Sequence, residues 1–333
     1  MAIAKILKKK EFSKTSICMA THNGEKYIKS QLKSIINQTI KPNEIIIYDD
    51  ASSDKTLEIL YSFIKKYKVD IKIIKGHYQI GVVNSFSKAI SAAKNEIIFL
   101  SDQDDIWMNN KIEKISKSFK EDDQLDLIFT NGETINHNDS LLKKDLFQFT
   151  RFNFLKRIDF LNNTKSNIIK YPHSALGMSM AFKKRNLDFI LPMNCNDSFM
   201  THDKWILLSI NFFGGKIKYL NEKLVKYRLH MLQESRLIRE KLLKKIYKDK
   251  SYYLKGQIES YEAILKNQKI SINRKNELVK NLLIEKIKFY KLRLKIIKNK
   301  NFFIIFNLNN IKSYFYFSSG FLSFLKDLAS FPN

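Results

Sequence analysis

Cysteine, glycine and proline are all scarce in this chain of 333 residues, which contains 2 Cys, 9 Gly and 4 Pro. Cys18 and Cys195 supply neither a disulfide framework nor the spacing of a cysteine metal site, so a reducing compartment fits best. No G-x-G-x-x-G follows the first apolar run, and no G-x-x-x-x-G-K-[ST] occurs. The sequence therefore supports neither a dinucleotide fingerprint nor an ATP-hydrolysing P-loop.

Long apolar runs are also missing. No stretch reaches the roughly 18 consecutive apolar residues that span a bilayer, and the nearest, FFIIF at residues 302–306, ends at Asn307. The opening MAIAKILKKKEF lacks the apolar core of roughly 7–15 residues that is typical of a secretory signal. We expect a cytoplasmic protein, either free in solution or bound peripherally to the inner face of the plasma membrane.

Acidic residues are outnumbered, with 33 Asp and Glu against 59 Lys and Arg and a net charge of +26. Such a surplus favours binding to anionic lipid or nucleic acid, or it reflects a bias toward Lys, Asn and Ile that places lysine on every solvated face. Residues 231–333 carry 22 Lys and Arg against 8 Asp and Glu. The positive charge is thus concentrated toward the C-terminus, which indicates two functional regions.

The first 130 residues alternate short Ile-rich runs with segments of helical periodicity. Short apolar runs bounded by polar residues predict strands, and apolar residues at helical spacing predict helices. Their repetition predicts an α/β fold with a mostly parallel, Rossmann-like sheet and helices on both faces. The predicted strands are 15–20, 44–48, 71–75, 96–100 and 125–130, and the predicted helices are 27–37, 54–66 and 82–93.

The pattern changes in the rest of the chain. Between residues 131 and 230 it is mixed, and from about residue 236 it is helical. In the mixed part the predicted strands are 178–183, 216–220 and 224–228, and the predicted helix is 203–213.

Polar residues follow three of the predicted strands, where the chain leaves the sheet. Thr21-His22-Asn23-Gly24 follows the first strand, Asp49-Asp50 the second and Asp102-Gln103-Asp104-Asp105 the fourth. Ligands of open α/β sheets bind outside the carboxyl ends of the strands. Three polar clusters at one edge of the sheet therefore predict a binding site.

The Asp-x-Asp spacing of Asp102 and Asp104 suits a hard divalent cation, Mg²⁺ or Mn²⁺, which prefers oxygen ligands and shares them with substrate phosphates. The cation would relieve the repulsion among these carboxylates and that of Asp105, and it would neutralise charge on a departing diphosphate. A carboxylate such as Asp50 can accept the imide N–H of a pyrimidine or hold ribose hydroxyls. Taken singly, each acidic cluster is equally compatible with a solvated turn.

Three segments together resemble a known enzyme family. They are SICMATHNGEKYIKSQLKSIINQTIKPNEIIIYDDASSDKT from residue 16, IGVVNSFSKAISAAKNEIIFLSDQDDIW from residue 80 and THDKWILLSINFFGGKIKYLNEKLVKYRLH from residue 201. In matching order over roughly residues 15–232, they resemble a family 2 glycosyltransferase with the nucleotide-diphosphosugar-binding GT-A fold. The DQDDIW segment, the His-Asp helix start and the Tyr-Arg-x-His end are similar to the rhamnosyltransferase-like branch. The shared order is more specific than any one motif.

The resemblance implies six positions that bind the nucleotide sugar, namely Thr21, Asn23, Asp49, Asp50, Asp102 and Gly177. The first two would line the nucleotide pocket, and the aspartate pair after the second strand would recognise the pyrimidine. The first aspartate of DQDD would face the ribose and the diphosphate. The glycine would lie where the backbone passes the acceptor and the donor sugar.

The resemblance also implies Asp104 and His230 as metal ligands and Asp203 as the catalytic base. The base would take the proton of an acceptor hydroxyl while that oxygen attacks the anomeric carbon from the face opposite the nucleotide. Because a free Asp has a pKa of about 4, we expect Asp203 to be partly buried and hydrogen-bonded. Two alternatives stay open. Asp203 is also a typical acid of a helix N-terminus. His230 can equally be an ordinary core or surface histidine, since the chain lacks the Asn and Gly that commonly follow this histidine in the family.

Residues 236–298 place Leu, Ile and Tyr at helical spacing with Lys between them. This pattern predicts amphipathic helices that pack on the catalytic domain or on each other. Docking on an anionic membrane leaflet is the second interpretation, to which the aromatic residues of 314–325 would add interfacial contacts, and both can hold together. We divide the chain into a GT-A catalytic domain at residues 1–232 and a basic helical region at residues 233–333.

The predicted function is that of a metal-dependent inverting glycosyltransferase. It would transfer a sugar, rhamnose in the branch that it resembles, from a dTDP- or UDP-linked donor to a polysaccharide or lipid-linked acceptor in bacterial surface glycan synthesis. We expect no nucleic-acid partner, since no recognised module accompanies the charge, and a homodimer stays open.

Two alternative functions stay open. A nucleotidyltransferase that makes sugar nucleotides would share the sheet and the aspartates, but it would need a Gly-rich loop after the first strand, where this chain offers only Gly24. A non-catalytic basic protein would bind membrane or nucleic acid with a steep salt dependence and would have no affinity for a pyrimidine diphosphate.

Overall fold

The computed structural model describes residues 12–67, 70–231, 233, 250–266, 276–299 and 307–317. The first third alternates strands and helices as predicted, in the order β1 Thr15–Thr21, α1 Ile28–Ile36, β2 Glu44–Asp49, α2 Thr56–Tyr67, β3 Ile71–Lys75, α3 Val82–Ser91 and β4 Ile97–Ser101. The strands β3, β2, β1 and β4 are hydrogen-bonded in that order, and all three pairings are parallel. The predicted α/β class is confirmed.

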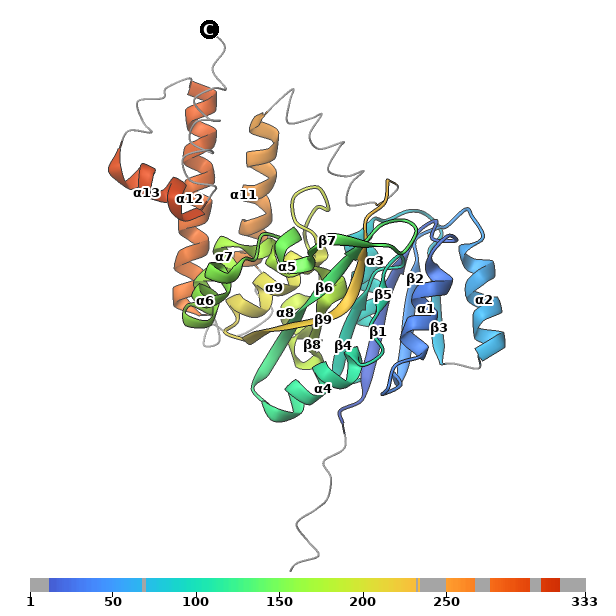
Figure 1. Ribbon diagram of the computed structural model, residues 1–333. Coiled ribbons are helices and arrows are strands. Elements are labelled where there is room, and N and C mark those ends of the chain that lie inside the picture. Colours follow the sequence, from blue (N-terminus) through green and yellow to red (C-terminus); the bar gives the residue numbers. More distant parts are fainter. Residues whose placement is uncertain are drawn as a thin grey trace, which may run out of the picture.

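Side chains of β1 alternate between two hydrophobic layers, as the period of a strand requires. Ile17 and Met19 pack with α1 and α2, whereas Cys18 packs with α3 on the other face. Figure 1 shows these helices on the two sides of the parallel strands. The layers leave one edge of the sheet, at the carboxyl ends of β1, β2 and β4, for the polar loops.

The middle of the chain extends the sheet and adds short helices beside it. Its elements are β5 Ile106–Trp107, α4 Lys111–Glu121, β6 Leu125–Ile135, β7 Leu141–Asp145, α5 Leu146–Phe149, α6 Phe154–Asn162, α7 Thr164–Lys170, β8 Met180–Lys183, α8 Leu187–Ile190, α9 His202–Phe212 and β9 Lys216–Arg228. Within the described residues the strands form one sheet in the order β3-β2-β1-β4-β8-β6-β9-β5, and β7 pairs with β6. β8 is antiparallel to both of its neighbours.

Two predicted strands prove to be one. The pattern breaks between residues 220 and 224, yet β9 is continuous and runs parallel to β6. The register between them shifts near Asn131, so the polar residues of β9 mark an irregularity in the pairing and not a turn of the chain. β6 likewise extends to Ile135, five residues beyond the prediction, because Asn131 and Thr134 are buried in spite of their polarity.

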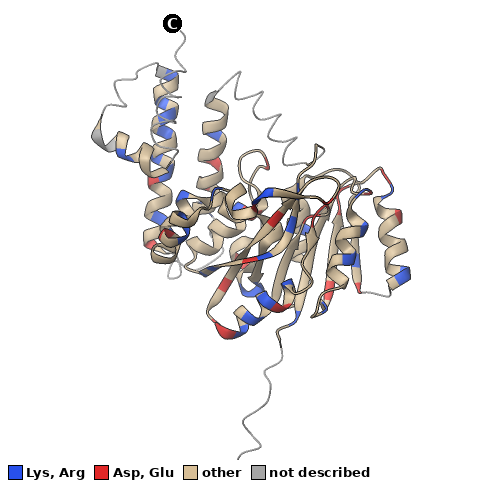
Figure 2. Cartoon of the chain, in the orientation of Figure 1, with Lys and Arg blue, Asp and Glu red and all other residues tan. Residues whose placement is uncertain are grey.

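The helices α11 Lys250–Lys266, α12 Glu277–Asn299 and α13 Leu308–Phe317 confirm the helical prediction for the described part of the C-terminal region. α11 and α12 pack on each other and on α9, and α12 also packs on α7. Their apolar side chains join the core that covers one face of the sheet, while Lys and Arg recur along α12 (Figure 2). The described C-terminal helices therefore pack on the α/β part of the chain and on each other, as the pattern predicted. Of the aromatic segment at 314–325, residues 318–325 lie outside the described residues, as does the apolar run at 302–306.

None of the described helices combines the length and the apolar character that a membrane span requires.

A lysine is buried where α12 meets α7. Lys286 is 2% exposed, its ammonium donates a hydrogen bond to the carbonyl of Ile169, and its nitrogen lies 4.9 Å from the ring centroid of Tyr261. Burial lowers the pKa of Lys286 to about 7, and the positive charge of Lys204 contributes to the shift. The protonated amine is therefore more stable in the unfolded chain, where the pKa is about 10.4.

This burial predicts a pH-dependent stability. Between about pH 7 and pH 10 the folded protein releases the proton before the unfolded chain does, so the folded state gains stability as the pH rises. Relative to Lys286→Met, the wild type should gain about 2 kcal/mol in free energy of unfolding from pH 7 to pH 9. Urea denaturation at the two pH values measures this gain. The exposed Lys295 of the same helix provides the control Lys295→Met, and a pH-independent difference for Lys286→Met would contradict the prediction.

Candidate functional site

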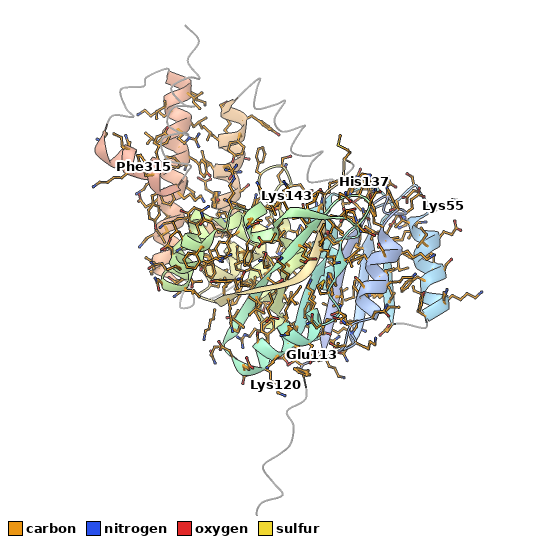
Figure 3. All side chains as sticks on the ribbon, viewed as in Figure 1. Lys55, Glu113, Lys120, His137, Lys143 and Phe315 are labelled. Atoms are coloured by element: carbon orange, nitrogen blue, oxygen red, sulfur yellow. The ribbon has the colours of Figure 1, made fainter. Side chains whose placement is uncertain are left out.

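The three polar clusters lie at one edge of the sheet, where β1, β2 and β4 end side by side. Thr21 is paired with Asp49 across the two strands, and Met19 is paired with Ser101. In Figure 3, Lys55 and His137 are labelled at this edge, and Glu113 and Lys120 of α4 are labelled at the opposite edge. The loops that bear the predicted site residues therefore meet at the position where open α/β sheets bind ligands.

Asp49 shapes the loop that follows β2. This carboxylate is fully buried, and it accepts hydrogen bonds from the hydroxyl of Thr21 at 2.9 Å and from the backbone N–H and hydroxyl of Ser52 at 3.0 and 2.6 Å. Both oxygens are thus engaged within the chain. The Asn23 amide oxygen accepts a bond from the N–H of Ser53 at 2.9 Å and so joins the β1 loop to the same turn.

Asp50 holds the loop that leads into α3. Its two oxygens accept the N–H groups of Ile80 and Gly81 at 2.7 and 2.9 Å. Gly81 has a φ of 85°, and a Cβ at this position would lie 2.5 Å from a carboxylate oxygen of Asp197. Asp197 accepts the N–H of Val83 at 2.9 Å, and its burial raises its pKa. Glycine is therefore required where two carboxylates converge on the start of α3.

The acidic stretch divides between the site and the core. Asp104 places Oδ2 2.8 Å from Nε2 of His230, and both side chains keep slight exposure, 13% and 12%. Asp105 is fully buried, with Oδ1 accepting the N–H of Arg228 at 2.9 Å and Oδ2 lacking a partner among the described residues. Burial raises the pKa of Asp105 well above its usual range, and the charges of Asp104 and Asp102 raise it further. Asp105 thus has a structural role, whereas Asp104 faces the candidate site.

Arg228 is a site residue that the sequence analysis did not single out. It is 1% exposed, and its guanidinium donates to the carbonyls of Asp104 at 2.6 Å and Asn136 at 3.2 Å and pairs with Asp139. It also lies 4.5 Å from the ring centroid of Tyr27, which in turn lies 5.0 Å from the ring of His230. One side chain therefore fixes the acidic loop, the end of β6 and the ring that packs on His230. The Tyr-Arg-x-His stretch was the available signal.

Gln103 is a second residue that the sequence analysis missed. Its amide accepts the N–H of His22 at 3.0 Å and donates to the carbonyl of His22 at 2.9 Å. This pair of bonds joins the acidic loop to the loop after β1. A glutamine between aspartates gives no signal of such a role in a single sequence.

Asp203 and Gly177 form a second group beside the first. The Asp203 carboxylate is 8% exposed and accepts the N–H of Gly177 at 3.2 Å, the N–H of Lys204 at 2.7 Å and the hydroxyl of Thr201. A Cβ on Gly177 would lie 2.5 Å from Nε2 of the His202 ring, so only glycine allows the backbone this close.

His202 links this second group to α3. Its ring stacks on Phe86 of α3 at a centroid distance of 3.9 Å, and neither of its nitrogens has a hydrogen-bond partner among the described residues. Burial lowers its pKa, so the ring is neutral at pH 7. Asp50 and Asp197 support the N-terminus of α3. The same helix thus also supports the segment beside Asp203.

The donor atoms of Asp104 and His230 fit a divalent cation in part. A carboxylate oxygen and an imidazole nitrogen are both ordinary ligands of Mn²⁺, and the oxygen also suits Mg²⁺. Among the described residues, no cluster of three or more His, Cys, Asp or Glu side chains could hold a metal ion by itself. A cation at this pair would therefore depend on the oxygens of a substrate diphosphate to complete its coordination.

Comparison with known proteins decides the family. Residues 16–185 match the family model described as glycosyl transferase family 2. The chain belongs to this family. The glycosyltransferase is 30% identical over 247 residues to an uncharacterized glycosyltransferase of Methanocaldococcus jannaschii, a match that covers 72% of this chain and 81% of the relative. The predicted family and enzyme class are confirmed.

Other relatives match shorter segments of the glycosyltransferase. It is 32% identical over 124 residues to the UDP-Glc:alpha-D-GlcNAc-diphosphoundecaprenol beta-1,3-glucosyltransferase WfgD of Escherichia coli, with 37% of this chain and 47% of the relative covered. It is 40% identical over 98 residues to the dTDP-rhamnosyl transferase RfbG of Shigella flexneri, with 28% and 34% covered. These matches thus span about half and about a third of the relatives' lengths.

Solved structures give the same fold. Residues 1–349 of S. aureus TarS, in complex with UDP-GlcNAc, align with a TM-score of 0.56 and 16% identity, covering 90% of the glycosyltransferase and 79% of that chain. The predicted GT-A fold is confirmed.

The contacts of Arg228 predict a large difference between two variants. Arg228→Met should lower the free energy of unfolding by about 2–4 kcal/mol, because two backbone carbonyls lose their donor and the guanidinium no longer ties the acidic loop to β9. Asp139→Asn, which removes the charge from a partner that is 62% exposed, should cost less than about 1 kcal/mol. Urea unfolding of both variants measures the difference, and equal losses would contradict it.

Proposed function

We propose that the glycosyltransferase performs metal-dependent, inverting transfer of a sugar from a dTDP- or UDP-linked donor. The observation that carries this proposal is the Asp104–His230 pair, which lies at the carboxyl edge of the sheet where family membership calls for a nucleotide diphosphate. In this proposal Asp104 and His230 hold Mg²⁺ or Mn²⁺, which supplies positive charge to the departing diphosphate.

The remaining residues would bind the donor. Thr21, Asn23, Asp49 and Asp50 would form the nucleotide pocket, and Asp102 would face the ribose and diphosphate. The bonds of Asp49 and Asp50 within the chain support a stiff pocket. The remaining lone pairs of these carboxylates would contact the nucleobase.

Asp203 would act as the base. Oδ1 is engaged by Thr201 and Lys204, whereas Oδ2 accepts only the long bond from Gly177 among the described residues and so retains room for a proton. The acceptor hydroxyl would give its proton to this oxygen as its own oxygen bonds to the anomeric carbon. As this bond forms, the bond from the same carbon to the diphosphate would break on the opposite face, so the configuration would invert and the diphosphate would leave with the bonding electron pair.

The acceptor and the sugar are proposed from the relatives. The names of WfgD and RfbG describe transfer to a GlcNAc-diphosphoundecaprenol and transfer of rhamnose from dTDP. We infer a polysaccharide or lipid-linked acceptor in bacterial surface glycan synthesis, with rhamnose as the first sugar to test. Residues 1–232 would form the catalytic domain and residues 233–333 a helical region that contacts the inner face of the plasma membrane. Family membership favours this function over a nucleotidyltransferase or a non-catalytic basic protein.

Calorimetric titration with dTDP, UDP and GDP, each with and without Mn²⁺, tests the donor site. We expect binding of one pyrimidine diphosphate that depends on the metal and falls at least about tenfold in Asp104→Asn, since a charged metal ligand is lost. Asp70→Asn, at an exposed aspartate outside the site, should bind as the wild type does. Absence of binding under every condition would overturn the proposal.

The variant Asp203→Asn tests the base. Turnover should fall by about 10²–10⁴-fold, the range of general-base catalysis, while the nucleotide affinity stays unchanged. Asp188→Asn is a matched control, because Asp188 occupies the first turn of α8 as Asp203 does that of α9. If both variants lose a similar amount of stability and neither loses turnover, Asp203 serves only as a helix N-terminal acid and its assignment as the base is wrong.

A further inference from the structure

Positive charges converge beside Asp203. The segment between α7 and β8 includes a helical turn at Pro172–Ser174, which packs against α7 and α9. The His173 side chain in this turn is exposed, but desolvation by its crowded surroundings lowers its pKa to about 4, and four positive charges contribute, those of Lys204, Lys156, Lys286 and Arg151. His173 is thus a neutral ring at pH 7 within a group of cations.

The cations come from separate elements that the fold brings together. The ammonium of Lys156 in α6 donates to the carbonyl of Arg151 at 2.8 Å and lies 4.4 Å from the ring centroid of Tyr171. Arg151, between α5 and α6, has a φ of 60°, a left-handed conformation that is uncommon outside glycine. Lys204 follows Asp203 in α9. The cluster therefore depends on tertiary packing and on an unfavourable backbone conformation.

The cluster lies within reach of an acceptor bound at Asp203. Gly177, whose N–H is hydrogen-bonded to the Asp203 carboxylate, lies four positions after His173 along the chain. A chain of that length spans at most about 14 Å. A hydroxyl group at the carboxylate and an anionic group at the cations can thus belong to one molecule.

The charges that shift the pKa values of His173, Lys156 and Lys286 are all positive. The nearby Asp159 acts on Tyr171 and accepts a bond from the side chain of Asn163. Bringing like charges together costs free energy, and such arrangements are typical of sites where a ligand supplies the opposite charge.

Helix α6 also carries an apolar surface on its outer side, which begins three residues after the exposed Arg151. Helix α6, which supplies Lys156 from its inner side, exposes Phe154, Leu155, Ile158 and Leu161 by 66%, 73%, 43% and 67%. The spacing of these four residues places them on one face of the helix. A soluble protein rarely exposes so many large apolar side chains together unless the face binds a partner.

We propose that Arg151, Lys156, His173 and Lys204 form a subsite for the phosphate or diphosphate group of the acceptor, and that the exposed face of α6 contacts a lipid attached to that group. This inference rests on the proposed function, because it concerns the acceptor that Asp203 would deprotonate. Lys286 is buried and supports the subsite without contacting the ligand.

Nuclear magnetic resonance of the histidine rings tests the subsite on the full chain. With metal-free millimolar pyrophosphate, the His173 signal should shift and its pKa should rise from about 4, because a nearby negative charge favours the protonated ring. The His230 signal should respond instead to UDP with Mg²⁺, which tests the donor site independently. An unchanged His173 signal would overturn the subsite whatever His230 shows, and an unchanged His230 signal would count against the donor site alone.

Charge variants test which side chains bind the anion. Arg151→Gln and Lys204→Gln should each weaken pyrophosphate binding by about tenfold, the loss of one charge-assisted hydrogen bond, while the affinity for UDP with Mg²⁺ stays unchanged. Lys165→Gln, at an exposed lysine of α7, should change neither affinity. Wild-type pyrophosphate affinity in both charge variants would overturn the assignment.

A short prenyl diphosphate distinguishes a lipid-linked acceptor from a soluble phosphate-bearing polymer. It should bind at least about tenfold more tightly than pyrophosphate, because the prenyl chain would cover apolar side chains such as the exposed Leu155. Leu155→Ser should remove much of that gain, because serine offers the prenyl chain no comparable apolar surface. Equal affinity for the two anions would overturn the lipid contact and assign the anion to a soluble acceptor.

Discussion

The buried guanidinium of Arg228 is the interaction on which the candidate site depends. Three carboxylates in four positions repel one another, and the carbonyls of their loop need donors once the loop is buried. Arg228 supplies both a positive charge and the donors, and its own N–H engages Asp105. The neutral form that burial favours for Asp105 removes one further charge. Only then does Asp104 remain as the carboxylate that faces His230.

Much of the fold could be predicted because local pattern and tertiary role agree there. β1 to β4 are fully or partly buried, so their apolar runs coincide with the strands to within one residue. α6 could not be predicted, since four of its large apolar residues face outward, with Phe160 as the buried exception, and Lys156 faces inward, which inverts the usual pattern. β7 is exposed along most of its length and gives no apolar run. The continuity of β9 depends on pairing with β6, which no local pattern reveals.

The candidate site shows the same division. The edge of the sheet could be predicted, because the polar clusters directly follow strands whose direction the alternation fixes. The roles of adjacent aspartates could not be predicted. Within each pair, Asp49 with Asp50 and Asp104 with Asp105, the two residues differ only in the direction in which the local backbone points the side chain. Asp49 and Asp105 lie at 0% exposure. Arg228 was overlooked because its acceptors, Asp104 and Asn136, lie about 90 or more positions away along the chain.

The C-terminal helices are part of the same structure as the catalytic core, and their charge is not confined to the surface. Lys286 inserts between α12 and α7, and its shifted pKa shows how strongly burial opposes the charged form. The two sides of the candidate site then differ in sign. An acidic edge needs a cation before it can accept a diphosphate, whereas the group around His173 attracts anions directly. A donor and an acceptor that both carry phosphate would thereby bind to different parts of the site, the donor with its metal and the acceptor without one.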